Sequence, residues 1–297
     1  MRIIGCPGQG SQSQGFLLPW LEAFPALKDR LSNLSQSAGR DLVRLGTVAD
    51  EEELRDTSNA QRLIVASAIA VYRELENQIR ADAVVGHSVG EFAAAAISGI
   101  LSDEDAVKLV GIRADAMAAA ASKVPTSMAA VVGGDFSSVV EAIEAAGLEP
   151  ANFNGGQIVA AGLKTNISNL VESPPTGTRV IELKVAGAFH TSFMSEAVQS
   201  LRQATSGIVV NDPKLSIWTN RDGTRVSSGQ DYLETMVMQT ASPVRWDLCM
   251  ESMNSKTGMF VELPPAGALS GLVKRGAQSL TAVALKTPGD LEKLESI

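Results

Sequence analysis

The chain contains few of the residues on which many small secreted and metal-binding proteins depend. Among its 297 residues only two are cysteines and two are histidines, and aromatic residues make up 4%. Cys6 and Cys249 show neither disulfide nor metal-site spacing, so the sequence predicts no disulfide framework and no bound metal. Such sparing use of cysteine favours the reducing cytoplasm as the location.

Positive charge and long apolar runs are also scarce. The 25 Lys and Arg residues are outnumbered by 33 Asp and Glu residues, which leaves a net charge of −8 and no electrostatic support for binding nucleic acid. The longest apolar run, residues 92–101, is interrupted by Ser98 and Gly99 and is too short to span a bilayer. Residues 1–7 lack the apolar core of a secretion signal. We therefore expect partners that are neither nucleic acids nor membranes.

The most informative stretch that the chain does contain is Gly86-His87-Ser88-Val89-Gly90, a Gly-x-Ser-x-Gly pattern. Apolar residues 81–85 precede it and an alanine-rich segment follows it, which places the pattern at a strand–turn–helix junction. Nucleophilic serines use such a turn, because small flanking glycines let strand and helix pass closely and the hydroxyl is held at a helix N-terminus. Ser88 is therefore a candidate nucleophile. A glycine-rich loop with a capping serine is the alternative.

A serine that attacks near neutral pH needs a general base, and histidine is the usual one. His87 adjoins Ser88, and the two side chains diverge at a sharp turn, so we expect His87 to pack beneath the turn. His190, in the loop that begins at Gly187, is then the candidate base. The alternative is a surface histidine without a catalytic role.

The order of apolar segments predicts an α/β fold in two parts. Residues 127–185 show the order βαββαβ, which is the ferredoxin-like pattern. We expect a small subdomain, residues 126–186, inserted into a larger domain of residues 1–125 and 187–297 with a mainly parallel sheet. Ser88 and His190 would then face a cleft between the two parts. In the larger domain we predict strands at 2–6, 83–85, 215–218, 259–263 and 279–285, and helices at 17–38, 60–79, 102–122, 192–204, 231–239, 269–276 and 290–295.

Taken together, the motifs resemble those of the malonyl-CoA:acyl carrier protein transacylases of fatty-acid synthesis, to which the acyltransferase domains of polyketide synthases are related. The similarity follows the family's order over almost the whole chain. It rests on Gly8-Gln9-Gly10-Ser11-Gln12, the Ser88 turn, Arg113 with Met117, Ala151-Asn152-Phe153-Asn154 with Gly156-Gln157, Ala188-Phe189-His190-Thr191, Gln239 with Ser242-Pro243-Val244-Arg245-Trp246, and residues 262–275.

The resemblance implies a large domain of α/β-hydrolase-like form and a reaction that passes through an acyl-serine. Ser88 would be the nucleophile and His190 its base, and the backbone N–H groups of Gln9 and Val89 would form the oxyanion hole. Gln239 would accept a hydrogen bond from His190 and so orient it. Malonyl-CoA would acylate Ser88, and the phosphopantetheine thiol of an acyl carrier protein would then take the malonyl group, in a ping-pong sequence without a cofactor.

Three residues bear on the choice of acyl group. Arg113 matches the family's arginine that pairs with the malonyl carboxylate, and an arginine suits this task because its planar fork donates two parallel hydrogen bonds. Met117 lies four residues later on the same helix face and is also assigned to the substrate site. The Gly187-Ala188-Phe189-His190 loop resembles the malonyl-selective form of the polyketide relatives, because methylmalonyl-selective members usually have a smaller residue in place of Phe189. From the residues alone, Arg113 could instead be a solvated arginine paired with Asp115 or Glu104.

Carrier proteins are acidic, so docking needs a local basic patch, for which Arg62, Lys184, Arg245, Lys274 and Arg275 are candidates. The family is typically monomeric, and we expect a monomer.

Three other functions stay open at this point. A polyketide pathway could use the chain as a trans-acting acyltransferase. A serine esterase or thioesterase would share Ser88 and His190 but would not need Arg113. A docking module without catalysis would need none of the three residues.

Overall fold

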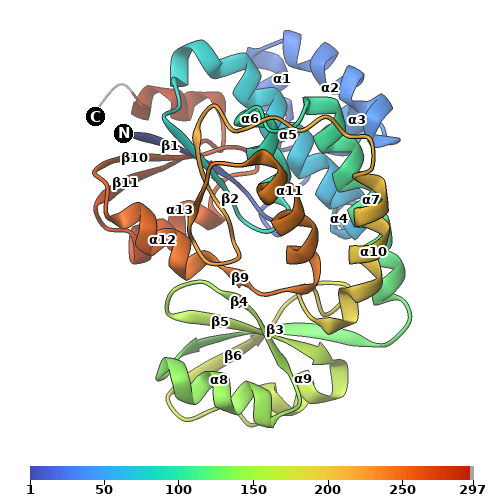
Figure 1. Ribbon diagram of the computed structural model, residues 1–297, viewed down its shortest axis with the longest axis vertical. Coiled ribbons are helices and arrows are strands. Elements are labelled where there is room, and N and C mark those ends of the chain that lie inside the picture. Colours follow the sequence, from blue (N-terminus) through green and yellow to red (C-terminus); the bar gives the residue numbers. More distant parts are fainter. Residues whose placement is uncertain (295–297) are drawn as a thin grey trace.

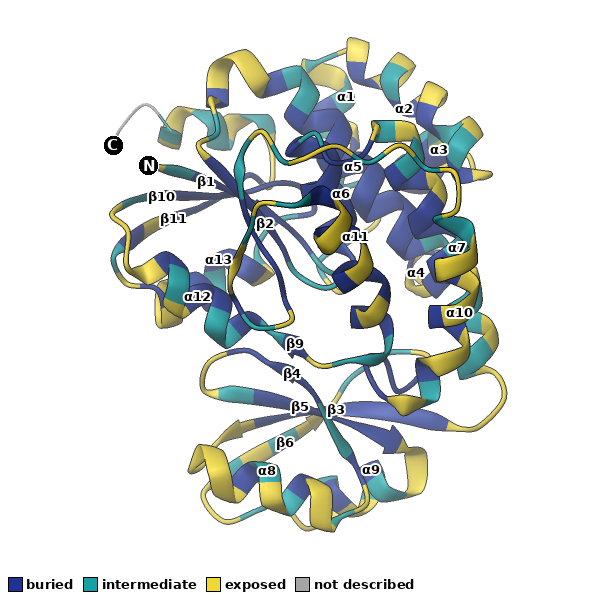
Figure 2. Cartoon of the chain, in the orientation of Figure 1, coloured by how far each residue is buried: buried dark blue, intermediate teal, exposed yellow. Residues whose placement is uncertain are grey.

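The structure of the protein, a computed structural model, describes residues 1–294. Its strands form a six-stranded sheet and a five-stranded sheet, which lie in separate parts of the molecule (Figure 1). The strands of the larger sheet are mostly buried, whereas the outer faces of the helices on the smaller sheet are exposed (Figure 2). The predicted mixed α/β fold is confirmed.

The larger sheet has the strand order β11-β10-β1-β2-β7-β8 and is parallel except for β8, which runs antiparallel to β7. Cys6 is in register with Gly86, so β1 and β2 end side by side. The loops that follow these two strands, which carry Gln9 and Ser88, therefore begin at the same edge of the sheet. The six strands are β1 (Arg2–Cys6), β2 (Ala83–Gly86), β7 (Ser216–Trp218), β8 (Arg225–Val226), β10 (Gly258–Glu262) and β11 (Leu280–Ala284).

Two hydrophobic cores lie on opposite faces of this sheet, because successive side chains of a strand point to opposite sides. Ile4 belongs to the core that includes helices α5 (Thr57–Ile79), α6 (Gly90–Ile97) and α7 (Asp103–Ala121). Ile3 belongs to the core formed with α12 (Trp246–Asn254) and α13 (Ala268–Gly276). The first core also takes in α1 (Leu18–Ala23), α2 (Ala26–Ala38), α3 (Leu42–Thr47), α4 (Glu51–Arg55), α10 (Ser195–Ala204) and α11 (Gly229–Met238).

The smaller sheet has the order β6-β3-β5-β4-β9. Its first four strands pair antiparallel, and β9 pairs parallel with β4. Helices α8 (Phe136–Ala145) and α9 (Lys164–Glu172) cover the face turned away from the larger part (Figure 1). The strands are β3 (Thr126–Gly133), β4 (Glu149–Phe153), β5 (Gln157–Leu163), β6 (Thr178–Glu182) and β9 (Val244–Arg245).

Several predicted boundaries differ from the structure. The single helix predicted at 17–38 is two helices, α1 and α2, because Pro25 lacks the N–H that a continuous helix needs there and instead precedes the first turn of α2. Helix α5 begins at Thr57 rather than 60, since Asp56 caps it by accepting from the Asn59 N–H. No helix was predicted at α3, α4 or α12, and no strand at β8 or β9.

Short 3₁₀ helices complete the described chain: η1 (Ser192–Met194), η2 (Gln239–Ala241) and η3 (Pro288–Leu294). The last predicted helix, residues 290–295, overlaps η3, and its final residue lies outside the described part. Within residues 1–294, no helix combines the length and the apolar character needed to cross a bilayer.

Candidate active site

The turn at Ser88 depends on close approach of the backbone on both sides. Ser88 itself has φ 53°, a left-handed conformation that costs free energy for a residue with a side chain. A Cβ on Gly86 would lie 2.2 Å from the Gly90 carbonyl carbon, and one on Gly90 would lie 2.2 Å from the Cys6 carbonyl oxygen. Only glycine therefore fits at either position, and the turn holds the Ser88 hydroxyl next to the first turn of α6.

His190 lies directly beside this hydroxyl, as predicted from the need for a base. The distance from Ser88 Oγ to His190 Nε2 is 2.7 Å, and that from His190 Nδ1 to the Gln239 backbone oxygen is 3.0 Å. Because a carbonyl can only accept, Nδ1 carries the proton and Nε2 is left as the acceptor for the serine O–H. Burial, and next the nearby Arg113 cation, lower the pKa of His190 to about 3, so its imidazole is neutral and ready to take a proton.

Two backbone donors lie free near the serine. Gln9 and Val89 line the same cavity as Ser88, and Val89 is the N-cap residue of α6. In the part of the chain that the structure describes, neither backbone N–H has an acceptor. Two unpaired donors beside a nucleophile can stabilise an oxyanion.

Arg113 brings a cation to the same cavity. It is 1% exposed, and its Nη1 donates to Gln61 Oε1 over 2.6 Å. Its Nη2 is buried and, within residues 1–294, has no hydrogen-bond partner. Burial lowers the pKa of Arg113 to about 10 and the nearby Glu91 opposes that shift, so the guanidinium is charged at neutral pH. The alternative of a solvated arginine is thus wrong: Asp115 pairs with Arg62, not with Arg113.

The cavity that these groups share measures about 190 Å³. Met117 and Phe189 supply apolar wall, and Met117 Sδ also accepts from Gln61 Nε2 over 3.6 Å. The space thus combines the Ser88 hydroxyl with two backbone N–H groups and an Arg113 Nη2 that have no hydrogen-bond partner among the described residues. All eight residues predicted for the site therefore lie together, and Gln239 takes part through its carbonyl. The eight are Gln9, Ser88, Val89, Arg113, Met117, Phe189, His190 and Gln239.

His87 points elsewhere, as the geometry of the turn predicts. Its Nε2 lies 3.1 Å from Asn154 Oδ1, and its ring packs edge-on against Trp246 with 5.4 Å between centroids. Burial lowers the pKa of His87 as well. It thus lines the cavity without reaching the serine hydroxyl.

Two buried residues of the site were missed by the sequence analysis as functional candidates. Asn220 Oδ1 accepts from the Ser88 N–H over 2.7 Å, and Glu91 Oε1 accepts from the Asn220 N–H over 2.8 Å. Burial raises the pKa of Glu91 to about 8. One feature could have identified Asn220 as a site residue: it closely follows strand β7, at the same edge of the sheet where β2 ends.

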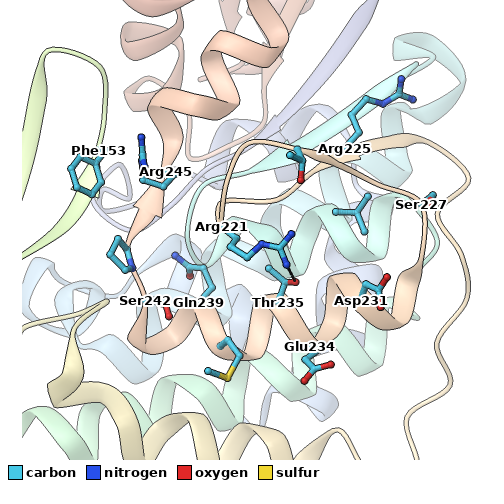
Figure 3. A pocket seen from close by; sticks show the side chains of 14 residues that line it. Phe153, Arg221, Arg225, Ser227, Asp231, Glu234, Thr235, Gln239, Ser242 and Arg245 are labelled. Atoms are coloured by element: carbon cyan, nitrogen blue, oxygen red, sulfur yellow. Dashed lines mark hydrogen bonds between the residues drawn. The ribbon is translucent and has the colours of Figure 1, made fainter.

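A second, larger cavity of about 750 Å³ lies between α11, β8 and β9 (Figure 3). Three arginines line it: Arg221 pairs with Asp222, Arg245 pairs with Asp247 and stacks on the Phe153 ring at 4.8 Å, and Arg225 donates to Ser216 Oγ. Its wall also includes Asp231 and Glu234, whose carboxylates offset the positive charge of the arginines.

Of the basic residues predicted for docking, Lys184, Lys274 and Arg275 are exposed and Arg245 is half-buried. The prediction for Arg62 is wrong. It is 4% exposed, and it donates to the Ala38 and Ser58 carbonyls as well as to Asp115.

Comparison with known proteins gives concordant matches over the full chain. Residues 5–292 match the family model described as acyl transferase domain. The malonyl CoA-acyl carrier protein transacylase of Mycobacterium tuberculosis is 45% identical over 303 aligned residues that cover 100% of both chains. The Escherichia coli (strain K12) protein of the same name is 32% identical over 95% of this chain and 94% of its own.

Two solved structures are also similar. The crystal structure of MCAT from Mycobacterium tuberculosis has a TM-score of 0.94 and 45% identity and covers 99% of each chain. The structure titled as a type II PKS acyl-carrier protein in complex with its malonyl-transacylase has a TM-score of 0.93 and 28% identity, with 100% of this chain and 99% of that chain covered.

Proposed function

The chain belongs to the malonyl CoA-acyl carrier protein transacylases, a group with the acyl transferase domain, and from this premise we propose that it transfers malonyl from malonyl-CoA to an acyl carrier protein. The transfer supplies fatty-acid synthesis. It is an acyltransferase reaction in which one thioester is exchanged for another through an ester of Ser88.

In the first half-reaction, the Ser88 O–H gives its proton to His190 Nε2 while Oγ attacks the thioester carbonyl of malonyl-CoA. The N–H groups of Gln9 and Val89 receive the oxyanion that forms on the carbonyl oxygen. The C–S bond then breaks, and the imidazolium returns its proton to the CoA sulfur. In the second half-reaction, His190 takes the proton of the phosphopantetheine thiol, whose sulfur attacks malonyl-Ser88, and the proton goes back to Ser88 Oγ.

One observation carries the malonyl assignment. The buried Nη2 of Arg113 has no partner within residues 1–294, in the cavity that holds the Ser88–His190 pair. An unpaired donor on a desolvated cation costs free energy unless a ligand satisfies it. The malonyl carboxylate is such a ligand, whereas the substrate of a simple esterase need not be.

The wider assignments belong to the same proposal. The reaction uses no cofactor, the enzyme acts in the cytoplasm, and the chain works as a monomer with Met117 and Phe189 shaping the acyl pocket. Residues 126–186 form a ferredoxin-like subdomain, which the order β6-β3-β5-β4 supports, inserted into an α/β-hydrolase-like domain of residues 1–125 and 187–297.

A polyketide role is the second candidate. It is favoured by the similarity to the malonyl-transacylase solved with a type II PKS acyl-carrier protein. The chemistry at Ser88 would be the same, and only the carrier would differ.

The proposal is tested by following the fate of the acyl group. The purified protein is mixed with radiolabelled malonyl-CoA and quenched, and the label is mapped by mass spectrometry. We expect rapid labelling of Ser88, slow loss of label to water and fast loss to holo carrier protein. Fast loss to water would instead identify a hydrolase.

The matched variants are Ser88→Ala and Ser98→Ala. The first should carry no label, and the second, at the other end of α6, should be labelled like the wild type. A stable adduct on another residue in Ser88→Ala would overturn the assignment of the nucleophile.

A further inference from the structure

We propose that Asn220 is a positioning residue, whose side chain locks the Ser88 turn so that the Val89 N–H, rather than the Ser88 N–H, is left for the oxyanion. The inference rests on the proposed function of Ser88 and adds to it a residue from a distant part of the chain. The relevant contacts join residues more than a hundred positions apart.

The Asn220 carboxamide contacts the turn at two points. Its Oδ1 accepts from the Ser88 N–H over 2.7 Å, and its Nδ2 donates to the Gly86 carbonyl over 2.8 Å. These two contacts fix which way round the carboxamide lies, because the Ser88 N–H can only donate and the Gly86 carbonyl can only accept. Asparagine supplies both groups from one planar side chain, and so ties the residue before His87 to the residue after it.

Asn220 is itself fixed from three sides. It is fully buried, its backbone N–H donates to Glu91 Oε1 over 2.8 Å, and its carbonyl accepts from the Arg245 N–H over 2.8 Å. Every polar group of the residue therefore has a partner. Arg245 lies in β9 of the smaller sheet, and Glu91 lies in the first turn of α6. The residue is anchored to both parts of the molecule as well as to the turn.

The consequence for catalysis depends on which backbone N–H groups of the turn remain available to an oxyanion. Ser88 and Val89 offer consecutive N–H groups, and Asn220 takes the first of them. Within the described residues the second has no acceptor, which is the state an oxyanion donor needs before substrate arrives. Asn220 also holds Ser88 at its left-handed φ of 53°, a conformation that needs support from its surroundings.

The test compares Asn220→Ala with a control variant at a residue that contacts the Asn220 carboxamide. Cys249 Sγ lies 3.7 Å from Asn220 Nδ2, so Cys249→Ala removes a neighbour of the carboxamide and keeps both contacts with the turn. Each protein is mixed with malonyl-CoA, and two quantities are recorded: the final amount of malonyl bound per chain and the first-order rate constant of its formation at saturating malonyl-CoA.

For Asn220→Ala we expect the acylation rate constant per reactive site to fall about 10–100-fold, the scale set by a misplaced nucleophile or a weakened oxyanion donor. The malonyl-CoA concentration for half-maximal rate should change less than about threefold, since Arg113 is untouched. Cys249→Ala should acylate at the wild-type rate. A residue needed only for folding would lower the amount of reactive protein and leave the rate constant of the folded fraction unchanged.

A wild-type rate constant in Asn220→Ala, or an equal loss in Cys249→Ala, would overturn the inference. If Asn220→Ala gives no reactive protein, Asn220→Ser takes its place. Its shorter side chain cannot span Gly86 and Ser88, so at least a tenfold loss is expected, and a wild-type rate constant would again refute the role. Failure of the wild type to form malonyl-Ser88 would refute the proposed function itself, which is a separate outcome.

Discussion

Arg113→Ala offers the most direct test of acyl selectivity, because it removes one charge from an enclosed site. Malonyl-CoA carries a carboxylate that acetyl-CoA lacks, and that carboxylate must lose water to enter the cavity of about 190 Å³. Under the proposed function Arg113 Nη2, which has no hydrogen-bond partner within residues 1–294, would meet it in the wild type. In the variant the carboxylate would be desolvated without a partner.

The size of the effect follows from burial. Arg113 is only 1% exposed, so solvent screens its charge little. Removing one partner of a buried, hydrogen-bonded charge pair costs about 2–5 kcal/mol. At about 1.36 kcal/mol per factor of ten, kcat/KM for malonyl-CoA should fall about 30- to 5,000-fold. Acetyl transfer should stay the same or rise, because no unpaired cation remains. Arg113→Lys should be intermediate, since an ammonium keeps the charge and loses the planar fork.

The assay measures kcat/KM for malonyl-CoA and acetyl-CoA with each variant. Arg73→Ala is a suitable control, because Arg73 lies in α5, which packs with α7 in the same core, and pairs with Asp103 away from the cavity. It should leave the malonyl-to-acetyl ratio unchanged. If Arg113→Ala lowered both substrates equally, Arg113 would have a structural role, and the carboxylate-binding argument would be refuted.

Predictions also follow for three further residues. His190→Gln should slow transfer about 10²–10⁴-fold. Because the pKa of His190 is lowered from 6.5 to about 3, kcat/KM of the wild type should show no inflection near pH 6.5. Between these two pH values His190 binds a proton in the unfolded chain but not in the folded chain. The free energy of unfolding of the wild type, measured by urea titration, should therefore fall on acidification more steeply than that of His190→Gln. His87→Ala, which loses the Asn154 contact, should lower the thermal midpoint of unfolding and leave the acylation rate constant close to that of the wild type. Slower acylation with an unchanged thermal midpoint would contradict the site geometry. Phe189→Ser should raise the methylmalonyl-to-malonyl ratio of kcat/KM, and an unchanged ratio would argue against a role in selectivity.

The serine turn could be predicted because its determinants are local. Five residues specify the strand end, the two glycines and the helix start, and no distant contact is needed to recognise the pattern. The base was predictable by elimination, since the chain has only two histidines and one of them adjoins Ser88. The roles of Gln9 and Gln239 came from the family resemblance alone, because both would act through the main chain.

What escaped prediction depends on the tertiary fold. Asn220 lies 132 residues from Ser88, and only the parallel pairing of β2 with β7 brings it to the turn. Arg62 was assigned to the surface because of its charge, yet α5 is buried along most of its length, and Asp115 and two carbonyls compensate the arginine inside. The break at Pro25, by contrast, has a local cause that the sequence contains, because proline lacks the N–H of a helix interior.

The hydrogen bond from His190 to the Gln239 carbonyl has a consequence for how this enzyme can vary by mutation. In a Ser-His-Asp triad a single codon change can delete the acceptor that orients the histidine. Here the acceptor is a main-chain oxygen, 3.0 Å from Nδ1, which every amino acid at position 239 would provide. The acceptor therefore depends on the path of the backbone through η2, and a substitution at position 239 would keep it as long as that path is unchanged.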